Sequence, residues 1–334
     1  MNLVRAEFSR LISRRFVQVM LIALVVAFGF TVLSVLSSSS TPTEQMWVEA
    51  RAQASEERRE LIRYRTLCVA AQEPQTPDSV RERYPKDCST INPDNIRAES
   101  YLYGVFNFRS SIEGLVGFLT AYLAFFGFLV AASFIGAEMR SGGMTNLLLW
   151  RPQRTTVLAT KLGVALGGIA ALSTVFTVVY VGTFWAIAQF SGWVGILEDG
   201  FWAELALLCL RGIVVALVAS AIAFAIAAIA KHTAAALGVL VGYVVLWEGG
   251  GRLVLDVIGL GSTEPWFGST YIGAWMIGKL SYDSCGRSYY DSYNMGWEAC
   301  QRYVYLWHGA LVMAVVAGLF LAGAFINFRR KDLA

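Results

Sequence analysis

Hydrophobic residues along the chain gather into six long blocks separated by more polar segments. Each block is about 20 residues long or longer, the length at which a helix crosses a hydrocarbon core of about 30 Å. Helices are also the only open-chain structures that satisfy their own backbone hydrogen bonds in lipid. The pattern therefore predicts an all-α polytopic membrane protein with six spans, at residues 16–36, 115–137, 162–190, 201–230, 233–247 and 305–328.

Lysine and arginine gather in the short segments on one side of these spans. Short flanks rich in Lys and Arg stay on the cytoplasmic side of a membrane. We therefore expect a multi-pass protein of the cell membrane with both termini in the cytoplasm, residues 1–15 at the start and 329–334 as a tail. The basic residues on this side are Arg5, Arg10, Arg14, Arg15, Arg140, Arg151, Arg154, Lys161, Lys231, Arg329, Arg330 and Lys331.

The composition agrees with a membrane protein and argues against other classes. Of the 334 residues, 56% are hydrophobic and 15% charged, whereas soluble domains have about 45–50% and about 25%. The basic residues flank apolar blocks instead of forming one patch, so nothing points to nucleic-acid binding. Two histidines and scattered carboxylates form no catalytic constellation. We therefore expect no enzyme activity, no metal and no cofactor in this chain.

The first outer segment, residues 37–112, is long enough to form a lobe of its own. Residues 43–66 are charged and rich in helix formers, and Glu56–Arg59 and Glu60–Arg63 have the spacing that supports an exposed helix. Four prolines after Glu73 predict irregular turns. A partly helical lobe is expected. A cleaved signal peptide in place of the first span is disfavoured, because the apolar block is long and no cleavage motif follows it.

The five cysteines fall into two outer pairs and one membrane position. Cys68 and Cys88 lie in the first outer segment, Cys285 and Cys300 in the last, and Cys209 in the fourth span. Local pairs in an oxidising compartment favour the disulfides 68–88 and 285–300. Free thiols are the alternative, and zinc is disfavoured because no C-x-x-C spacing occurs. Cys209 is expected to be a small buried apolar residue.

The segment between the second and third spans, residues 138–161, has the features of a folded element. Gly142 and Gly143 permit a sharp reversal. Residues 145–150 then form an amphipathic turn whose apolar side needs a covering surface. The N-terminal stretch is also amphipathic, since apolar and basic residues can take opposite faces of one helix. Its apolar face is expected to hold Leu3, Phe8, Leu11 and Ile12, opposite Arg10 and Arg14.

These segments resemble the permease subunits of the ABC-2 family, also called type V ATP-binding cassette exporters. In that family the second span ends in Glu, followed by a small/Thr-Leu-Leu-rich stretch, a Pro-Arg-like element and a Lys that opens the third span. The matching residues here are Glu138, Gly143-Met144-Thr145, Leu147–Leu149, Arg151-Pro152-x-Arg154 and Lys161. The N-terminal stretch is similar to the family's connecting helix. The initial Arg151 is less typical, and the large outer lobe departs from the minimal family pattern.

The resemblance implies a coupling helix at residues 145–150 that docks in a groove of a cytoplasmic ATPase. ATP and Mg would bind to that partner, present in two copies. The permease would pair with a second copy of itself or a homologous permease, among membrane lipids. The implied ATPase contacts are Glu138, Arg140, Thr145, Leu147, Leu148, Trp150, Arg151, Arg154 and Lys161. The alternative is that the charged residues among them are ordinary anchors at the membrane surface.

One short motif imitates a nucleotide-binding loop. Residues 273–279 match G-x-x-x-x-G-K, but Leu280 stands where Ser or Thr would bind magnesium. The motif is also expected outside the membrane, with no strand before it and no ATP supply. Because the chain has no other such motif, ATP hydrolysis is expected on a separate subunit.

Residues 248–304, before the last span, contain apolar stretches too short to cross a membrane. The fifth span is expected to break at Glu248–Arg252, and the stretches that follow are expected to form re-entrant or interfacial helices. The resemblance implies that such helices close the outer mouth. Four aromatic residues would line this gate or form an interfacial belt, namely Trp266, Phe267, Tyr271 and Trp275.

Charged residues close to or inside the spans are further candidates for a substrate path or gate. Arg211 and Glu204 lie seven residues apart on one face of the fourth span, at a depth where charges are costly and indicate function. A purely structural pair is the alternative. The charged candidates are Glu204, Arg211, Glu248 and Arg252.

The predicted function is the permease subunit of an ATP-binding cassette exporter. Its substrate is expected to be amphipathic, such as a drug, lipid or lipopeptide, because the spans offer few polar groups. One alternative is a membrane sensor or mechanotransmission protein whose lobe binds a protein or ligand. A secondary transporter is another, although no internal repeat is visible.

Overall fold

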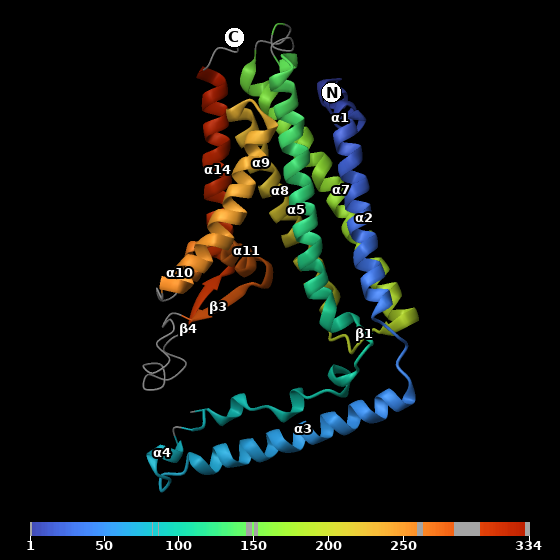
Figure 1. Cartoon of the computed structure of the whole chain (residues 1–334), viewed down its shortest axis with the longest axis vertical. Helices are drawn as coiled ribbons and strands as arrows, with labels where there is room; N and C mark the ends of the chain where they lie inside the picture. The colour runs from blue at the N-terminus through green and yellow to red at the C-terminus, as the bar shows by residue number, and fades with distance from the viewer. Residues whose placement is uncertain are drawn as a thin grey trace. The chain divides into compact units, whose positions relative to one another are not determined.

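The computed structural model describes residues 2–81, 83–85, 87–144, 149, 153–258, 263–283 and 301–330. Within these residues six helices are long and apolar enough to cross a membrane. They are α2 (Arg15–Ser37), α5 (Phe108–Arg140), α7 (Arg154–Ser191), α8 (Phe201–Ala230), a continuous run over Thr233–Leu255 and α14 (Leu306–Arg330) (Figure 1). The predicted class, an all-α polytopic membrane protein, is confirmed.

The chain divides into two compact units. The first contains Met1–Gly29, Glu113–Tyr180 and Asp199–Ala334, and the second contains Phe30–Ile112 and Val181–Glu198. The first unit therefore holds most of the spans, and the second holds the lobe. The candidate sites described below all lie within the first unit.

The centre of the first unit is the pair α5 and α8. In the most apolar stretch of α5, 67% of the residues are buried, against 6% in α2. Small residues let the two helices approach, since a Cβ added to Gly127 would lie 2.3 Å from Ser220 Oγ, and one added to Gly212 would lie 2.3 Å from Thr120 Oγ1. Close approach at small residues is how membrane helices gain packing energy.

The fifth span does not break at Glu248–Arg252, contrary to the sequence-based expectation. It runs from α9 (Thr233–Val241) through a π-helix, η4 (Gly242–Gly251), into α10 (Arg252–Ile258). A Cβ on Gly249 or Gly250 would lie 3.5 and 3.4 Å from the carbonyl oxygens five residues earlier, an ordinary contact distance, so the widened helix tolerates these glycines without requiring them. The glycines that suggested a break instead belong to a widened helix.

Short elements follow α10. They are η5 (Glu264–Trp266), α11 (Gly268–Ile277) and the antiparallel strands β3 (Lys279–Asp283) and β4 (Gln301–Tyr305). The motif that imitates a nucleotide-binding loop runs from α11 into β3, and Lys279 Nζ lies 3.7 Å from the ring centre of Tyr303. A phosphate-binding loop needs the opposite order, strand then helix. The rejection of this motif therefore has a structural reason.

The second unit is built on α3 (Glu44–Ala71), a helix of 28 residues that starts where the Thr43 side chain accepts a hydrogen bond from the N–H of Met46. The remaining elements of this unit are α4 (Asp78–Arg81), η1 (Cys88–Thr90), η2 (Pro93–Asn95), η3 (Ala98–Tyr101) and the parallel strands β1 (Phe106–Asn107) and β2 (Gly192–Trp193). None of the ion pairs among the described residues joins Glu56 to Arg59 or Glu60 to Arg63. Instead Arg58 pairs with Asp94 of η2.

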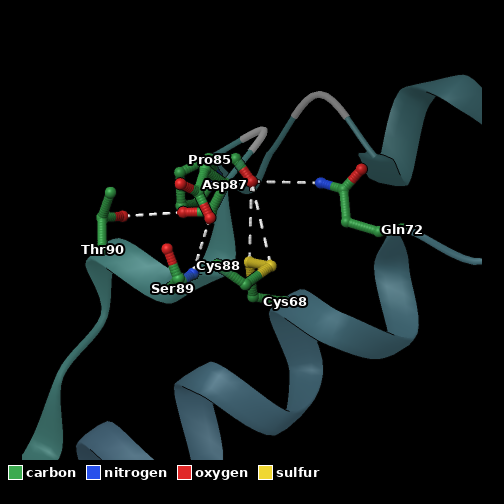
Figure 2. Close-up of a disulfide and its surroundings, with 7 residues drawn as sticks. All are labelled: Cys68, Gln72, Pro85, Asp87, Cys88, Ser89 and Thr90. Atoms are coloured by element: carbon green, nitrogen blue, oxygen red, sulfur yellow. Dashed lines mark hydrogen bonds between the residues drawn. A yellow bond between two sulfur atoms is a disulfide. The ribbon is translucent and has the colours of Figure 1, made fainter.

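A disulfide between Cys68 and Cys88 ties the end of α3 to η1 (Figure 2). Beside it Gln72 Nε2 donates to the carbonyl oxygen of Pro85 at 3.1 Å. Hydrogen bonds from the side chain and backbone of Ser89 lower the pKa of Asp87, which caps η1. This pairing confirms the first predicted disulfide. Cys285 and Cys300 lie outside the described residues, and Cys209 is a free, partly buried thiol.

Candidate functional site

Four charged side chains meet where α1 (Asn2–Ser13), the end of α5 and the start of α7 come together. We call Glu7, Arg14, Glu138 and Lys161 the terminal ion cluster. Lys161 Nζ lies 2.6 Å from Glu7 Oε2 and 2.5 Å from Glu138 Oε2. The side chains of Lys161 and Glu7 are 1% exposed, and that of Glu138 is 13% exposed. The lysine is thus held between two carboxylates and away from water.

Arg14 completes the charge balance of the terminal ion cluster. Its Nη2 donates to Glu138 Oε1 at 2.6 Å, and its Nη1 donates to the carbonyl oxygen of Ser133 at 3.1 Å. The Phe134 ring lies under both cations, 5.0 Å from the Arg14 guanidinium and 5.4 Å from Lys161 Nζ. Glu7 Oε1 also lies 3.3 Å from Nη1 of Arg10, an exposed residue of α1. Each of the two carboxylates therefore has cationic partners, which is the condition for burying charges at tolerable cost.

Local sequence explains how Glu7 reaches this position. Glu7 and Leu11 are four residues apart, so they share one face of α1, and both are buried. Gly168 of α7 makes room, because a Cβ there would lie 3.0 Å from Leu11 Cδ2. Phe8 and Ile12, expected on the covered face, are 44% and 51% exposed. The buried face of α1 is therefore centred on Glu7 and Leu11, and sequence reasoning missed Glu7.

The predicted ATPase contacts fall into three groups. Glu138 and Lys161 are satisfied within the chain by the terminal ion cluster. Arg140 Nη1 lies 3.3 Å from His232 Nε2, at the turn between α8 and α9, and Arg154 begins α7. Thr145, Leu147, Leu148, Trp150 and Arg151 lie outside the described residues. Contact of these residues with an ATPase stays a prediction.

A second polar cluster surrounds the start of α11. We call Tyr243, Glu248, Arg252, Glu264 and Ser269 the α11 cluster. Glu248 accepts hydrogen bonds from Tyr243 OH at 2.5 Å, from the backbone N–H of Ser269 at 3.0 Å and from Ser269 Oγ at 2.8 Å. Tyr243 OH in turn accepts from the backbone N–H of Gly268 at 3.0 Å. The first two N–H groups of α11 therefore bond to side chains of the fifth span.

Arg252 joins the remaining members of the α11 cluster. It donates through Nη2 to Ser269 Oγ at 2.7 Å and lies 3.6 Å from Glu264 Oε2. Its guanidinium lies 4.5 Å from the ring centre of Phe267, which is 1% exposed. The predicted gate residues Glu248, Arg252 and Phe267 are thus brought together, whereas Trp266 is 67% exposed.

Arg211 bonds to the other end of α11. Its Nη1 donates to the carbonyl oxygen of Met276 at 3.0 Å, and Trp275 Nε1 donates to the carbonyl oxygen of Arg211 at 3.0 Å. Tyr271 OH donates to the carbonyl oxygen of Pro265 at 2.9 Å. No ion pair between described residues links Arg211 with Glu204, which is exposed. The structural partners of Arg211 are therefore backbone groups of α11, and a role of Arg211 or Glu204 in a substrate path stays a prediction.

The described residues define a membrane protein with six apolar spans and with charged clusters where helices meet. Among these residues no group of three metal-ligating side chains occurs. Residues 1–333 match the family model of the ABC-2 family transporter protein, and the chain belongs to that family. Its members are transmembrane subunits that are not themselves catalytic and that generally pair with an ATPase subunit. A search of curated proteins found no significant match.

Proposed function

We propose that this chain is the permease subunit of an ATP-driven exporter and that residues 138–161 are its contact with the ATPase. The terminal ion cluster carries the proposal. Glu138 lies just before this segment's reversal and Lys161 lies about two turns into α7. Lys161 forms one ion pair with Glu138 and a second with Glu7 of α1. A push on the segment is therefore passed to three elements through contiguous contacts.

The segment also presents an uncovered apolar side chain. Leu149 is 78% exposed, whereas Met144 at the end of the reversal is 1% exposed. In the sequence Leu149 belongs to the apolar run Leu147–Trp150, and a contiguous exposed apolar patch is a surface that a partner protein covers. The Lys- and Arg-rich flanks favour the cytoplasmic side for this segment and for both termini. A cytoplasmic ATPase that binds ATP and Mg is the partner proposed, in two copies.

The outer faces of several spans support a permease pair embedded in lipid. Only 6% of the most apolar stretch of α2 and 17% of that of α14 are buried within the chain. These apolar faces are available for lipid or for a second permease, either identical or homologous. The cargo proposed is an amphipathic drug, lipid or lipopeptide, because such molecules can leave the bilayer along apolar spans. Transport is outward in this proposal.

The direct test is affinity purification of the full chain in mild detergent, with mass identification of co-purifying proteins. The unmodified chain should retain an ATP-binding cassette ATPase. Leu149→Asp should lose it, because a charge placed in a covered apolar contact is costly. Val69→Asp is the matched control, since Val69 is also an exposed apolar residue (56%) but belongs to the lobe. Equal recovery with both variants would remove Leu149 from the contact.

A membrane sensor is the second candidate, and the compact second unit favours it. Its 28-residue helix and the Cys68–Cys88 disulfide form a lobe with internal contacts of its own. In the same purification, absence of any ATPase with the unmodified chain would contradict the exporter and leave the sensor as the better proposal.

A further inference from the structure

We infer that α11 forms one body with α8 and α14, and that its contact with the fifth span, through the α11 cluster, is the contact that opens when ATP drives the permease. The inference rests on the proposed function for its ATP dependence. Its structural part concerns only how α11 is attached. The attachment differs at the two ends of this ten-residue helix.

The carboxyl-terminal half of α11 is attached through backbone groups. A Cβ added to Gly309 of α14 would lie 2.4 Å from the carbonyl oxygen of Tyr271 and 3.2 Å from the backbone N of Trp275. The reciprocal bonds between Arg211 and residues 275–276 each use a backbone carbonyl oxygen. The N–H of Leu306 donates to the carbonyl oxygen of Gly278 at 2.8 Å. Separating these surfaces would expose closely packed backbone, so α11 moves with α8 and α14.

Among the described residues, the hydrogen bonds between the amino-terminal end of α11 and the fifth span are made by side chains of that span. The first N–H groups of a helix have no partner inside the helix, and Phe267 at the cap position supplies no side-chain bond. Tyr243 and Glu248 supply the missing acceptors from η4. Trp247 adds a bond from Nε1 to the carbonyl oxygen of Trp266 at 3.1 Å. Side-chain contacts of this kind can be made and broken by rotation.

Charge makes the closed arrangement favourable at both ends. A helix carries partial positive charge at its amino end and partial negative charge at its carboxyl end. Glu248 lies at the first and Arg211 at the second, so each charge has the favourable sign. The two ends still differ, because Arg252 and Glu264 beside Glu248 are 41% and 42% exposed. When α11 moves away, water can therefore replace its groups as hydrogen-bond partners of Glu248 and Arg252.

The π-helix supplies a means of opening. Glu248 and Tyr243 both belong to η4, and π-helical turns inside longer helices are frequent at functional sites. A change from the i→i+5 hydrogen bonds of a π-helix to the i→i+4 bonds of an α-helix would rotate the side chains that follow about the helix axis. Such a rotation would withdraw Glu248 from Ser269 while the bonds of Arg211 to α11 stay in place.

Hydrogen–deuterium exchange on the purified full chain tests the attachment without any partner. Glu248→Ala should raise exchange at the amide of Ser269 about tenfold or more, since its bond to a charged acceptor is lost. Residues 272–277 should keep their protection, because α8 and α14 still hold them. Tyr243→Phe is the milder variant and should affect Gly268 alone. Arg211→Gln should instead raise exchange near Gly278. Unchanged exchange in the first two variants, or a rise throughout α11, would overturn the inference.

The same measurement on the complex with its ATPase tests the opening. A non-hydrolysable ATP analogue should raise exchange at Gly268 and Ser269 and spare the amides of 306–309. Protection of Gly268 and Ser269 that persists in a complex that hydrolyses ATP would overturn the opening while the proposed function stands. If no ATPase binds the chain, the proposed function fails, and the variants alone still decide how α11 is attached.

Discussion

The terminal ion cluster and the α11 cluster both place charges at a junction of three elements, but they differ in exposure and in the kind of partner. In the first, Lys161 and Glu7 are 1% exposed and every bond to a side chain joins opposite charges. In the second, Glu248 is 15% exposed, but Arg252 and Glu264 beside it are 41% and 42% exposed. Glu248 bonds to the neutral groups of Tyr243 and Ser269 and lies 3.7 Å from Arg252.

This difference in exposure and in partners indicates which of the two junctions can open. Removing one partner from a buried ion cluster leaves an uncompensated charge, at a cost of several kcal/mol. In the α11 cluster the neutral donors Tyr243 and Ser269 bond to the Glu248 carboxylate, and water can replace the lost partner where the cluster is exposed, so that separation leaves no unpaired buried ion. The terminal ion cluster is therefore suited to transmit a displacement, and the α11 cluster to separate under it.

The largest effect should come from Lys161→Met. Glu7 and Glu138 would then face each other without the cation between them, and the free energy of unfolding should fall by about 3–5 kcal/mol. Thermal unfolding of the purified chain in detergent measures this. The double variant Glu7→Gln with Lys161→Met should recover part of the loss, because one buried charge is removed. A loss of less than about 1 kcal/mol for the single variant would mean that the terminal ion cluster is no stronger than a surface pair.

A smaller loss is expected for Arg14→Gln, of about 1.5–3 kcal/mol, because Arg14 donates to a carboxylate and to a carbonyl oxygen. Arg15→Gln is the matched control, since Arg15 is the next residue and is exposed. Denaturant titration of both variants side by side gives the comparison. Similar losses in the two would show that Arg14 acts through overall charge and not through Glu138.

Much of the fold followed from hydropathy alone, because a span needs only a long apolar block, and six were found. The Cys68–Cys88 disulfide followed from local pairing in the first outer segment. Glu138 and Lys161 were found by their positions in a motif. Their neighbour Glu7 was not, because it bonds to a lysine 154 residues away and no periodicity in α1 reveals that.

Two further misses have physical causes. A pair of Arg211 with Glu204 was the structural alternative, but Arg211 bonds to the carbonyl oxygen of Met276, and its part in a substrate path stays a prediction. A backbone acceptor has no signature in a sequence pattern. The glycines after Glu248 suggested a break, because glycine weakens an α-helix. The structure instead continues the helix through these glycines as the π-helix η4, and glycine content alone does not distinguish a break from a wider turn.

A modest effect is expected for Glu248→Gln, of about 1 kcal/mol, because the amide keeps an acceptor for Ser269 but loses the charge near the start of α11. Thermal unfolding again reads it out. Glu204→Gln is the control, since Glu204 is an exposed carboxylate of a neighbouring span. A loss as large as that of Lys161→Met would erase the distinction between the two clusters.

The smallest effect should come from Arg58→Gln in the lobe, where Arg58 and its partner Asp94 are 51% and 73% exposed. Exposed ion pairs contribute about 0.2–1 kcal/mol, and salt screens them. Raising the ionic strength should therefore abolish the difference between Arg58→Gln and the unmodified chain in limited proteolysis of the lobe. The loss caused by Lys161→Met should persist at high salt, because its partners are out of reach of solvent ions. If salt reduced both losses equally, burial would not be what separates the terminal ion cluster from an exposed pair, and the assignment of a rigid junction to Glu7, Glu138 and Lys161 would fail.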